Sequence, residues 1–584
     1  MRLLNKKYGK IIVVGVAGVI LLVALLNFYP KDEEIKVEPV QDTVVDTRIS
    51  PLTDQAVFVE IKQIRKIGII DQMMDTGSLV KRVNDRDIGS NEWIVKGQLD
   101  QYGLNTLIKS FLPGNGWDDE PTFTYQLTID GFEWKPVVTN FTTWNTGFIF
   151  QESYKVVEEE QEHSTVRISI FEAEEGTGLF RRSVSQKEVD SFQVTYDFRN
   201  GTWQGDDFFN DSDGYGHYEG DEYDIWFDIR QTDYDGDGIP YWTEVNILKT
   251  DPRFNDFNSD PDCDGCSTAW EWKWGYDPFI WDNHTFLDPD NDGLQNVEEE
   301  YMMKWISQPF YPQMYIEVDL SEKDPDIIGH LGKWNIEMKE MKFLPLKRPA
   351  IVRSYIEGDT YELWPQAKEM IIERFGEHGI AVYVDDGSMG GGGETLPYIA
   401  DEDAEIIAQP TQMSEIYKKY FADDRKGIFR YLVICNGGGW AYNEDFIGMY
   451  DMMVVPQSTE YYKGSLLLAF TERAQIVSQA ISIFHEMGHT CGFGYLHCGG
   501  VDNMSTRTDF DELGYVEWHD YQSVMNYYWY GCRYFDYSDG SHGPNDVDDW
   551  GLLDVGYFQR TQYAPELEGI AFDRTEPPYN RGEH

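Results

Sequence analysis

The run Ile476-Val-Ser-Gln-Ala-Ile-Ser-Ile-Phe-His485-Glu486-Met-Gly-His489 decides the fold of the C-terminal half of this chain. Apolar residues recur at helical spacing before His485, so the run predicts a helix. His485 and His489 then stand at i and i+4 on one face, where both can bind one metal ion. Glu486 lies one residue further round, close enough to act on a water at the metal without binding the metal itself. The pattern therefore predicts a zinc site with an adjacent catalytic carboxylate.

Two further features follow this helix. Gly492 can end the helix in a left-handed turn that sends the chain back toward the metal. Met525 stands thirty-six residues beyond His489, in the short run Ser523-Val-Met-Asn-Tyr527. Together with the helix, these features resemble the metzincin clan of zinc endopeptidases, over roughly residues 310 to 560. The resemblance implies that Met525 forms an apolar floor beneath the zinc ion and that Tyr527 binds zinc or stabilises the oxyanion.

The third zinc ligand departs from the metzincin pattern. HExxHxxGxxH would place a histidine at position 495, which is Tyr495 here, whereas His497 follows two residues later. We expect His497 to reach the metal through a slightly longer loop. Tyr495, His519 and a carboxylate near Asp502 are the alternatives.

The residues upstream of this helix predict an α/β domain with a mostly parallel sheet. Strand-like and helix-like runs alternate there. The predicted strands are 314–320, 380–384, 429–434 and 451–455, and the predicted helix is 365–375. The glycine run 390–393 lacks the Lys-Ser/Thr pair of a phosphate loop, so we expect no nucleotide.

A twelve-residue pattern occurs three times before this domain. Each copy has carboxylates at positions 1, 3 and 5, Gly at position 6 and Glu at position 12, which is the pattern of a Ca²⁺ loop. The predicted ligands are Asp233, Asp235, Asp237 and Glu244; Asp260, Asp262, Asp264 and Glu271; and Asp288, Asp290, Asp292 and Glu299. The repeat period of 27 and then 28 residues resembles thrombospondin type 3 repeats, which implies about three structural Ca²⁺ ions. Cys263 and Cys266 lie inside the second loop without a second CxxC pair, which disfavours a zinc ribbon.

The N-terminal half predicts a β-sandwich behind a membrane segment. Strand-like runs at 57–61, 123–129, 166–171, 192–198 and 223–229 alternate in polarity between turns, as in an antiparallel sandwich. A C2-like, calcium-binding sandwich is an alternative because of the Asp-rich turn 210–214.

Basic residues precede the apolar run 11–26, which predicts a single-pass anchor with the bulk of the chain outside the cytoplasm. A cleaved signal peptide, giving a secreted protein, is the alternative.

Composition excludes one class of partner. The chain of 584 residues has 48 Lys+Arg against 103 Asp+Glu, a formal charge of −55, so we expect no nucleic-acid partner.

The fold class is multidomain: an all-β sandwich, a calcium-repeat stalk and an α/β metzincin-like domain. The predicted boundaries are 1–30 membrane segment, 31–54 tether, 55–230 sandwich, 231–305 calcium repeats, 310–565 protease domain and 566–584 tail.

These expectations combine into one functional prediction. The chain would be a membrane-anchored zinc endopeptidase that cleaves a protein or peptide substrate, with Glu486 as general base and then general acid. The alternative is a calcium-dependent surface adhesin or envelope structural protein whose HExxH helix is inactive. Zinc content distinguishes the two, because the adhesin would hold calcium alone.

Overall fold

The structure is a computed structural model of the whole chain, and it divides into two compact units, 1–47 and 48–584. The described residues are 46–50, 52–74, 120–134, 140–158, 160–178, 181–207, 211–212, 214–323, 335–341, 344–352, 360–399, 410–421, 425, 427–435, 440–441, 452–456, 472–494, 497–503, 517–531 and 534–557. The predicted membrane segment, most of the tether, the tail and Tyr495 lie outside them. So does part of the turn 210–214.

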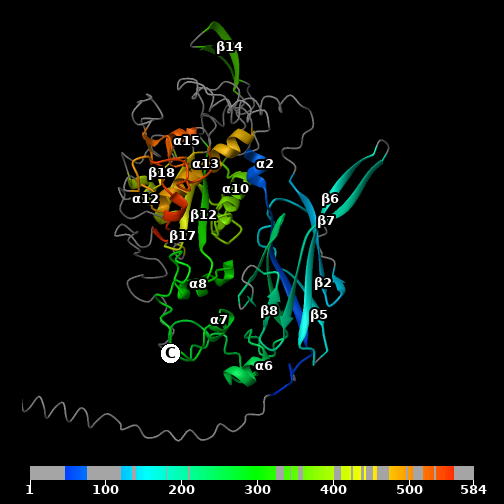
Figure 1. Cartoon of the computed structure of the whole chain (residues 1–584). Coiled ribbons are helices and arrows are strands. Elements are labelled where there is room, and N and C mark those ends of the chain that lie inside the picture. The colour runs from blue at the N-terminus through cyan, green and yellow to red at the C-terminus, as the bar shows by residue number, and fades with distance from the viewer. Residues whose placement is uncertain are drawn as a thin grey trace, which may run out of the picture. The chain divides into compact units, whose positions relative to one another are not determined.

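Two antiparallel sheets form the first part of the second unit (Figure 1). One contains β1 (Ala56–Lys66), β5 (Gln151–Val156), β10 (Gly216–Glu219) and β11 (Tyr223–Gln231), in the order β10-β11-β1-β5. The other contains β2 (Thr122–Ile129), β3 (Phe132–Trp134), β4 (Phe141–Thr142), β6 (His163–Gly178), β7 (Arg181–Asp197), β8 (Thr202–Gly205) and β9 (Asp211–Ser212). Buried apolar side chains from both sheets form one core.

The alternation expected of a strand is clearest in β2. Along β2, buried residues alternate with half-buried ones, so every second side chain enters the core. All five predicted strand segments of this region lie in antiparallel strands, apart from Phe198, which follows β7. Ile49, which the sequence places in the tether, is buried in the same core. The packed part therefore begins earlier than predicted.

Short helical segments follow each calcium-type loop. They are α6 (Tyr241–Thr243) with η1 (Glu244–Leu248), α7 (Thr268–Lys273), and α8 (Asn296–Met302) with η2 (Met303–Trp305). Their apolar cluster is small: Tyr215, Cys266, Trp270, Trp274, Val297 and Ile306. Buried apolar area is the main stabilising term in most domains, so this segment needs another source of stability.

The C-terminal part contains a mixed sheet whose central strands are parallel. β12 (Gln313–Ser321) pairs in parallel with β15 (Ala381–Asp385), β16 (Thr395–Leu396) and β17 (Phe429–Cys435), and β17 pairs in parallel with β19 (Met452–Pro456). The last strand, β18 (Trp440–Ala441), is antiparallel to β19 and lies at the edge of the sheet. The predicted strands and their mostly parallel arrangement are confirmed.

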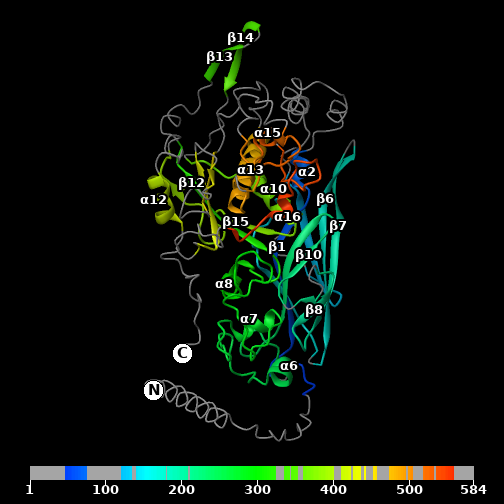
Figure 2. The same cartoon turned by 60° about the vertical axis from the view of Figure 1, so that its left-hand side comes forward.

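Helices cover both faces of this sheet (Figure 2). Met314, Ile316 and Val318 of β12 pack in one core with α10 (Pro365–Gly376) and α13 (Glu472–Thr490). Tyr315, between them, belongs to the opposite core together with residues of α12 (Pro410–Tyr420). Because a strand presents alternate side chains to opposite faces, β12 is buried on both faces, including the polar Glu317 and Asp319.

The remaining described elements are short. They are α2 (Ile69–Met74), the antiparallel hairpin of β13 (Asn335–Met341) and β14 (Leu344–Val352), α15 (Tyr527–Gly531) and α16 (Asp549–Leu552). Glu373 of α10 accepts hydrogen bonds from the first backbone N–H groups of α2 at 2.9 to 3.2 Å. This carboxylate caps α2 and joins it to the α/β part.

Within the described residues, we find no helix with the length and apolar character needed to cross a membrane.

Candidate metal centres

Helix α13 carries the two predicted zinc histidines near its C-terminal end. Its apolar residues, among them Val477, Ile481 and Phe484, face the core and fix the rotation of the helix. His485 and His489 then lie one turn apart, and both are buried, with 2% and 5% of their surface exposed. The sequence prediction that they share one face of a helix is confirmed.

The end of α13 has the conformation that its sequence predicts. Gly492 has a φ of 98°, and Phe493 donates its backbone N–H to the carbonyl of Gly488 at 3.0 Å. This is the left-handed helix ending that glycine favours. It places the Phe493 carbonyl beside Nδ1 of His489, to which it is hydrogen-bonded.

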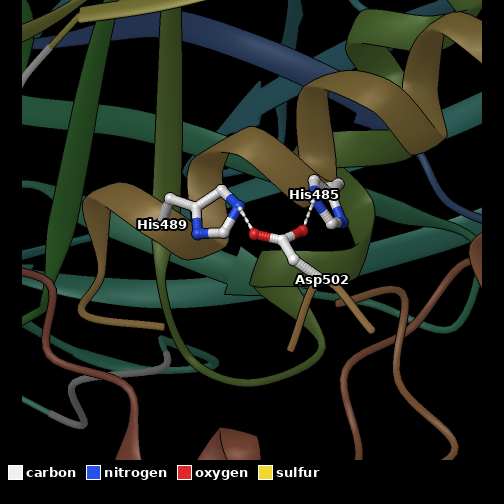
Figure 3. Close-up of side chains that lie close together, drawn as sticks. All are labelled: His485, His489 and Asp502. Carbon is white, nitrogen blue, oxygen red and sulfur yellow. Dashed lines mark hydrogen bonds and ion pairs between the residues drawn. The ribbon is translucent and has the colours of Figure 1, made fainter. Parts of the chain in front are cut away.

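Asp502 completes a three-residue group with the two histidines (Figure 3). Its Oδ1 lies 3.1 Å from Nε2 of His485, and its Oδ2 lies 3.4 Å from Nε2 of His489. Asp502 has a φ of 52°, a left-handed conformation that Asp adopts more readily than most residues. Its N–H donates to the carbonyl of Met525 at 3.0 Å, which ties it to the methionine turn.

His497 does not join this group, contrary to our prediction. Its Nε2 lies 2.7 Å from Oδ1 of the buried Asp549, which also accepts hydrogen bonds from Tyr521 and the N–H of Ser538. Asp549, which Tyr521 and Ser538 hold in place, therefore fixes the imidazole in a structural network. His519, another predicted alternative, lies beside Trp529. Of the alternatives, the carboxylate near Asp502 is the one that the structure places with His485 and His489.

The donor set fits Zn²⁺. Nδ1 of His485 lies 2.9 Å from the carbonyl of Val524, and Nδ1 of His489 is hydrogen-bonded to the carbonyl of Phe493, so each ring donates its Nδ1 proton. Each Nε2 faces Asp502 and, in the neutral imidazole that binds a metal, would offer its lone pair there. Four ligands about 2.1 Å from a tetrahedral zinc are ~3.4 Å apart, close to the separations seen here. Two imidazoles and a carboxylate are also a ligand set that catalytic zinc uses.

The pKa shifts of His489 and Asp502 favour a positive charge between the members of this group. Burial opposes a charge on His489, but Asp502 outweighs it and raises the pKa of the imidazole to about 9. Burial likewise opposes the charge on Asp502, yet the two histidines hold the pKa of that carboxyl well below its usual range. A proton or a metal ion can supply the positive charge that both effects require.

Glu486, Met525 and Tyr527 surround this group. Glu486 is buried, which raises its pKa, and it accepts a hydrogen bond from the N–H of Ala441 in the edge strand β18. Met525 is fully buried below α13, so closely packed that a Cβ on Gly488 would lie 2.5 Å from its Sδ. The ring of Tyr527 stacks on His485, with centroids 5.5 Å apart.

The three acidic loops share one backbone conformation. Their residues at positions 4 and 6 have φ between 63° and 105°: Gly236, Cys263 and Asn291, and Gly238, Gly265 and Gly293. In each loop the Asp at position 1 accepts the N–H of position 6, at 2.6 to 3.1 Å. The Asp at position 5 accepts the N–H of position 7, at 2.8 to 3.2 Å. The sequence repeat is thus a repeat of loop geometry.

Each loop gathers carboxylate oxygens that the protein itself leaves without hydrogen-bond donors. Both oxygens of Asp235, Asp262, Glu271 and Glu299 are buried and accept no hydrogen bond from the protein. Burial, together with neighbouring carboxylates of the same loop, raises the pKa of Glu244 to about 9 and that of Asp290 to about 9. Oxygen donors that need a positive charge fit Ca²⁺. In each loop, the predicted glutamate at position 12 lies close to the aspartates of the same loop.

Comparisons with known proteins add little. Neither protein-family models nor curated proteins match the sequence. Among solved structures, human GIVD cytosolic phospholipase A2 in complex with methyl gamma-linolenyl fluorophosphonate and terbium chloride matches at 13% identity, and human GIVD cytosolic phospholipase A2 in a second structure at 14%. Each match covers 31% of this chain but only 18% and 17% of the other, with a TM-score of 0.14. Such a low score supports no inference about fold or function.

Proposed function

We propose that the chain is a zinc-dependent endopeptidase whose metal is held by His485, His489 and Asp502. The observation that carries this proposal is the convergence of two Nε2 atoms and one carboxylate beside Glu486, all on or against one helix. The methionine turn below Gly488 and the left-handed Gly492 add support for a metzincin-like domain. Asp502 then takes the place that histidine has in the clan's usual pattern.

Each protein group near the metal has a distinct part in the proposed reaction. Zn²⁺, when bound, supplies a Lewis acid that lowers the pKa of water and polarises the scissile carbonyl. Glu486 takes the proton from the attacking water and later delivers it to the leaving amine. Its burial raises its pKa, which favours the return of that proton. Tyr527, stacked on His485, is placed to donate its hydroxyl proton in a hydrogen bond to the oxyanion.

The edge strand supports a peptide as substrate. β18 pairs with β19 on one side, and among the described strands it is the last of the sheet. An extended peptide can add to such an edge through main-chain hydrogen bonds. Because Ala441 of β18 donates to Glu486, a peptide bound along this edge would pass close to the proposed catalytic carboxylate.

Calcium and location complete the proposal. The first and third loops, whose gathered donors are oxygens, would bind Ca²⁺, which would stabilise a segment that has little apolar core. We also propose that the segment 1–30 anchors the chain in a membrane with the protease outside the cytoplasm.

The test is digestion of casein and of a peptide library by the purified chain in excess Ca²⁺. Cleavage that 1,10-phenanthroline abolishes and added Zn²⁺ restores is the expected result. A chain that contains Ca²⁺, binds no zinc at His485 and His489 and cleaves nothing would instead support the adhesin alternative.

A further inference from the structure

The second acidic loop contains a buried histidine that the calcium pattern does not predict. His284 lies outside the twelve-residue motif, yet its ring meets the carboxylates of Asp264 and Glu271 at positions 5 and 12. All three side chains have 0% of their surface exposed. Trp270 and Tyr276 close the ring in with edge-to-face contacts. Solvent therefore does not compensate the charges of this group.

The separations in this group are those of atoms that share a metal. Nε2 of His284 lies 3.3 Å from Oδ2 of Asp264 and 3.6 Å from Oε1 of Glu271. Both distances exceed a good N–H···O hydrogen bond, and neither Nε2 nor either oxygen of Glu271 has a hydrogen-bond partner in the protein. Ligands about 2.1 Å from a tetrahedral ion stand ~3.4 Å apart, midway between the two values.

Asn296 fixes the orientation of the ring. Its amide Nδ2 lies 2.8 Å from Nδ1 of His284 and 3.1 Å from the hydroxyl of Tyr276, while its Oδ1 is buried without a hydrogen-bond partner in the protein. Exchanging the amide nitrogen and oxygen by a half-turn of the group lets Oδ1 accept the Nδ1 proton, and Nε2 then keeps a lone pair facing Asp264 and Glu271. Metal-binding histidines are commonly oriented by such a partner on their other nitrogen.

Asp262 supplies a fourth donor. Its carboxylate oxygens lie in a group with that of Asp264, within 4.8 Å, and accept no hydrogen bond from the protein. Asp260 is occupied differently, because its oxygens accept the N–H groups of Cys263 and Gly265. Because Asp264 belongs both to this group and to the group with His284 and Glu271, Asp262 would complete a four-coordinate site of three carboxylates and one imidazole.

The first loop offers a comparison. Asp256, 19 residues after Asp237, contacts the position 5 carboxylate there, and His284 stands 20 residues after Asp264. The first loop is thus complete with oxygen donors alone. Ca²⁺ prefers oxygen, whereas imidazole favours first-row transition metals such as Zn²⁺.

We propose that the second loop is a structural transition-metal site of the Zn²⁺ class, with His284 as its nitrogen ligand beside Asp262, Asp264 and Glu271. The first and third loops remain calcium sites. This site is separate from the group formed by His485, His489 and Asp502, and it does not depend on the proposed protease activity.

The test measures bound metals in the whole chain carrying His485→Ala and His489→Ala, which remove the other zinc ligands. After equilibration with Zn²⁺ and excess Ca²⁺ followed by gel filtration, mass spectrometry of the metals should find about one zinc ion per chain. X-ray absorption at the zinc edge should show one imidazole among oxygen ligands. A zinc-free chain overturns the proposal, whatever the activity of the unsubstituted protein.

Substitution of the proposed nitrogen ligand gives a second and more specific test. His284→Asp makes the second loop an all-oxygen site like the first, so zinc should be lost and calcium should rise by about one ion per chain. The gain of calcium also reports that the loop still folds. His542→Ala is the matched control, because His542 lies beside Asp539 and Asp546 in a surface group and should leave both counts unchanged. The proposal is contradicted if the His284→Asp chain still binds one zinc ion, or if the His542→Ala chain binds none.

Discussion

Replacing Asp502 by Asn and His497 by Asn should have opposite consequences. Asp502→Asn keeps the size of the side chain but removes the charge that faces both histidines at 3.1 and 3.4 Å. Loss of a partner outside the ligand set costs 10- to 100-fold in metal affinity, so loss of a ligand should cost more than ~100-fold, or ~2.7 kcal/mol. Peptide cleavage should disappear with the zinc.

His497→Asn should instead reduce stability and spare the metal. The substitution removes the contact of 2.7 Å with Asp549, which keeps its hydrogen bonds from Tyr521 and Ser538. A buried charged acceptor that loses one partner costs about 1 to 3 kcal/mol. For a domain of this size, the melting temperature should fall by roughly 2 to 12 °C.

Two measurements separate the variants. Competition with a zinc-selective chelator gives the zinc affinity, and calorimetry in excess Ca²⁺ gives the melting temperature. The assignment of Asp502 would be refuted if Asp502→Asn still bound zinc tightly while a folded His497→Asn chain no longer did.

Two further predictions concern packing and calcium. Gly488→Ala places a Cβ 2.5 Å from Sδ of the buried Met525, so calorimetry should show a loss of about 1 to 3 kcal/mol. The double variant with Met525→Ala should lose less than the sum of the two single changes, and simple additivity would contradict a direct clash. With all metals chelated, the loop carboxylates have folded pKa values above their unfolded ones, near 9 for Glu244, so the folded state binds more protons. The melting temperature of the chelated chain should therefore fall as pH rises from about 5 to 9, and excess Ca²⁺ should remove that fall and release protons on binding. A rise over the same range without metal would count against the loops as cation sites.

Local patterns predicted most of the elements around the site. Helical spacing before His485 and alternation or apolar runs in the strands report burial, and burial is what the structure realises in α13, β12 and β17. The three loops were also predictable, because calcium ligation requires fixed residue types at fixed positions.

The carboxylate that joins His485 and His489, our proposed third zinc ligand, depended on information that spacing does not contain. His497 stands nearer to the expected position, but Asp549, 52 residues later, holds its imidazole. Asp502 instead reaches the histidines because its backbone is tied to Met525. Ile49 was missed because its partners lie in distant strands, and His284 was missed because it lies outside the twelve-residue motif and no short motif marks it.

The most direct test of the proposed function is hydrolysis of a peptide library by the wild-type chain and by Glu486→Gln, with bound zinc measured in the same samples. Gln keeps the shape of the side chain but cannot take a proton from water. We predict that both proteins hold the same amount of zinc and that Glu486→Gln loses at least ~100-fold in kcat, the lower end of a general base's contribution. Equal turnover by the two proteins would contradict the proposed mechanism.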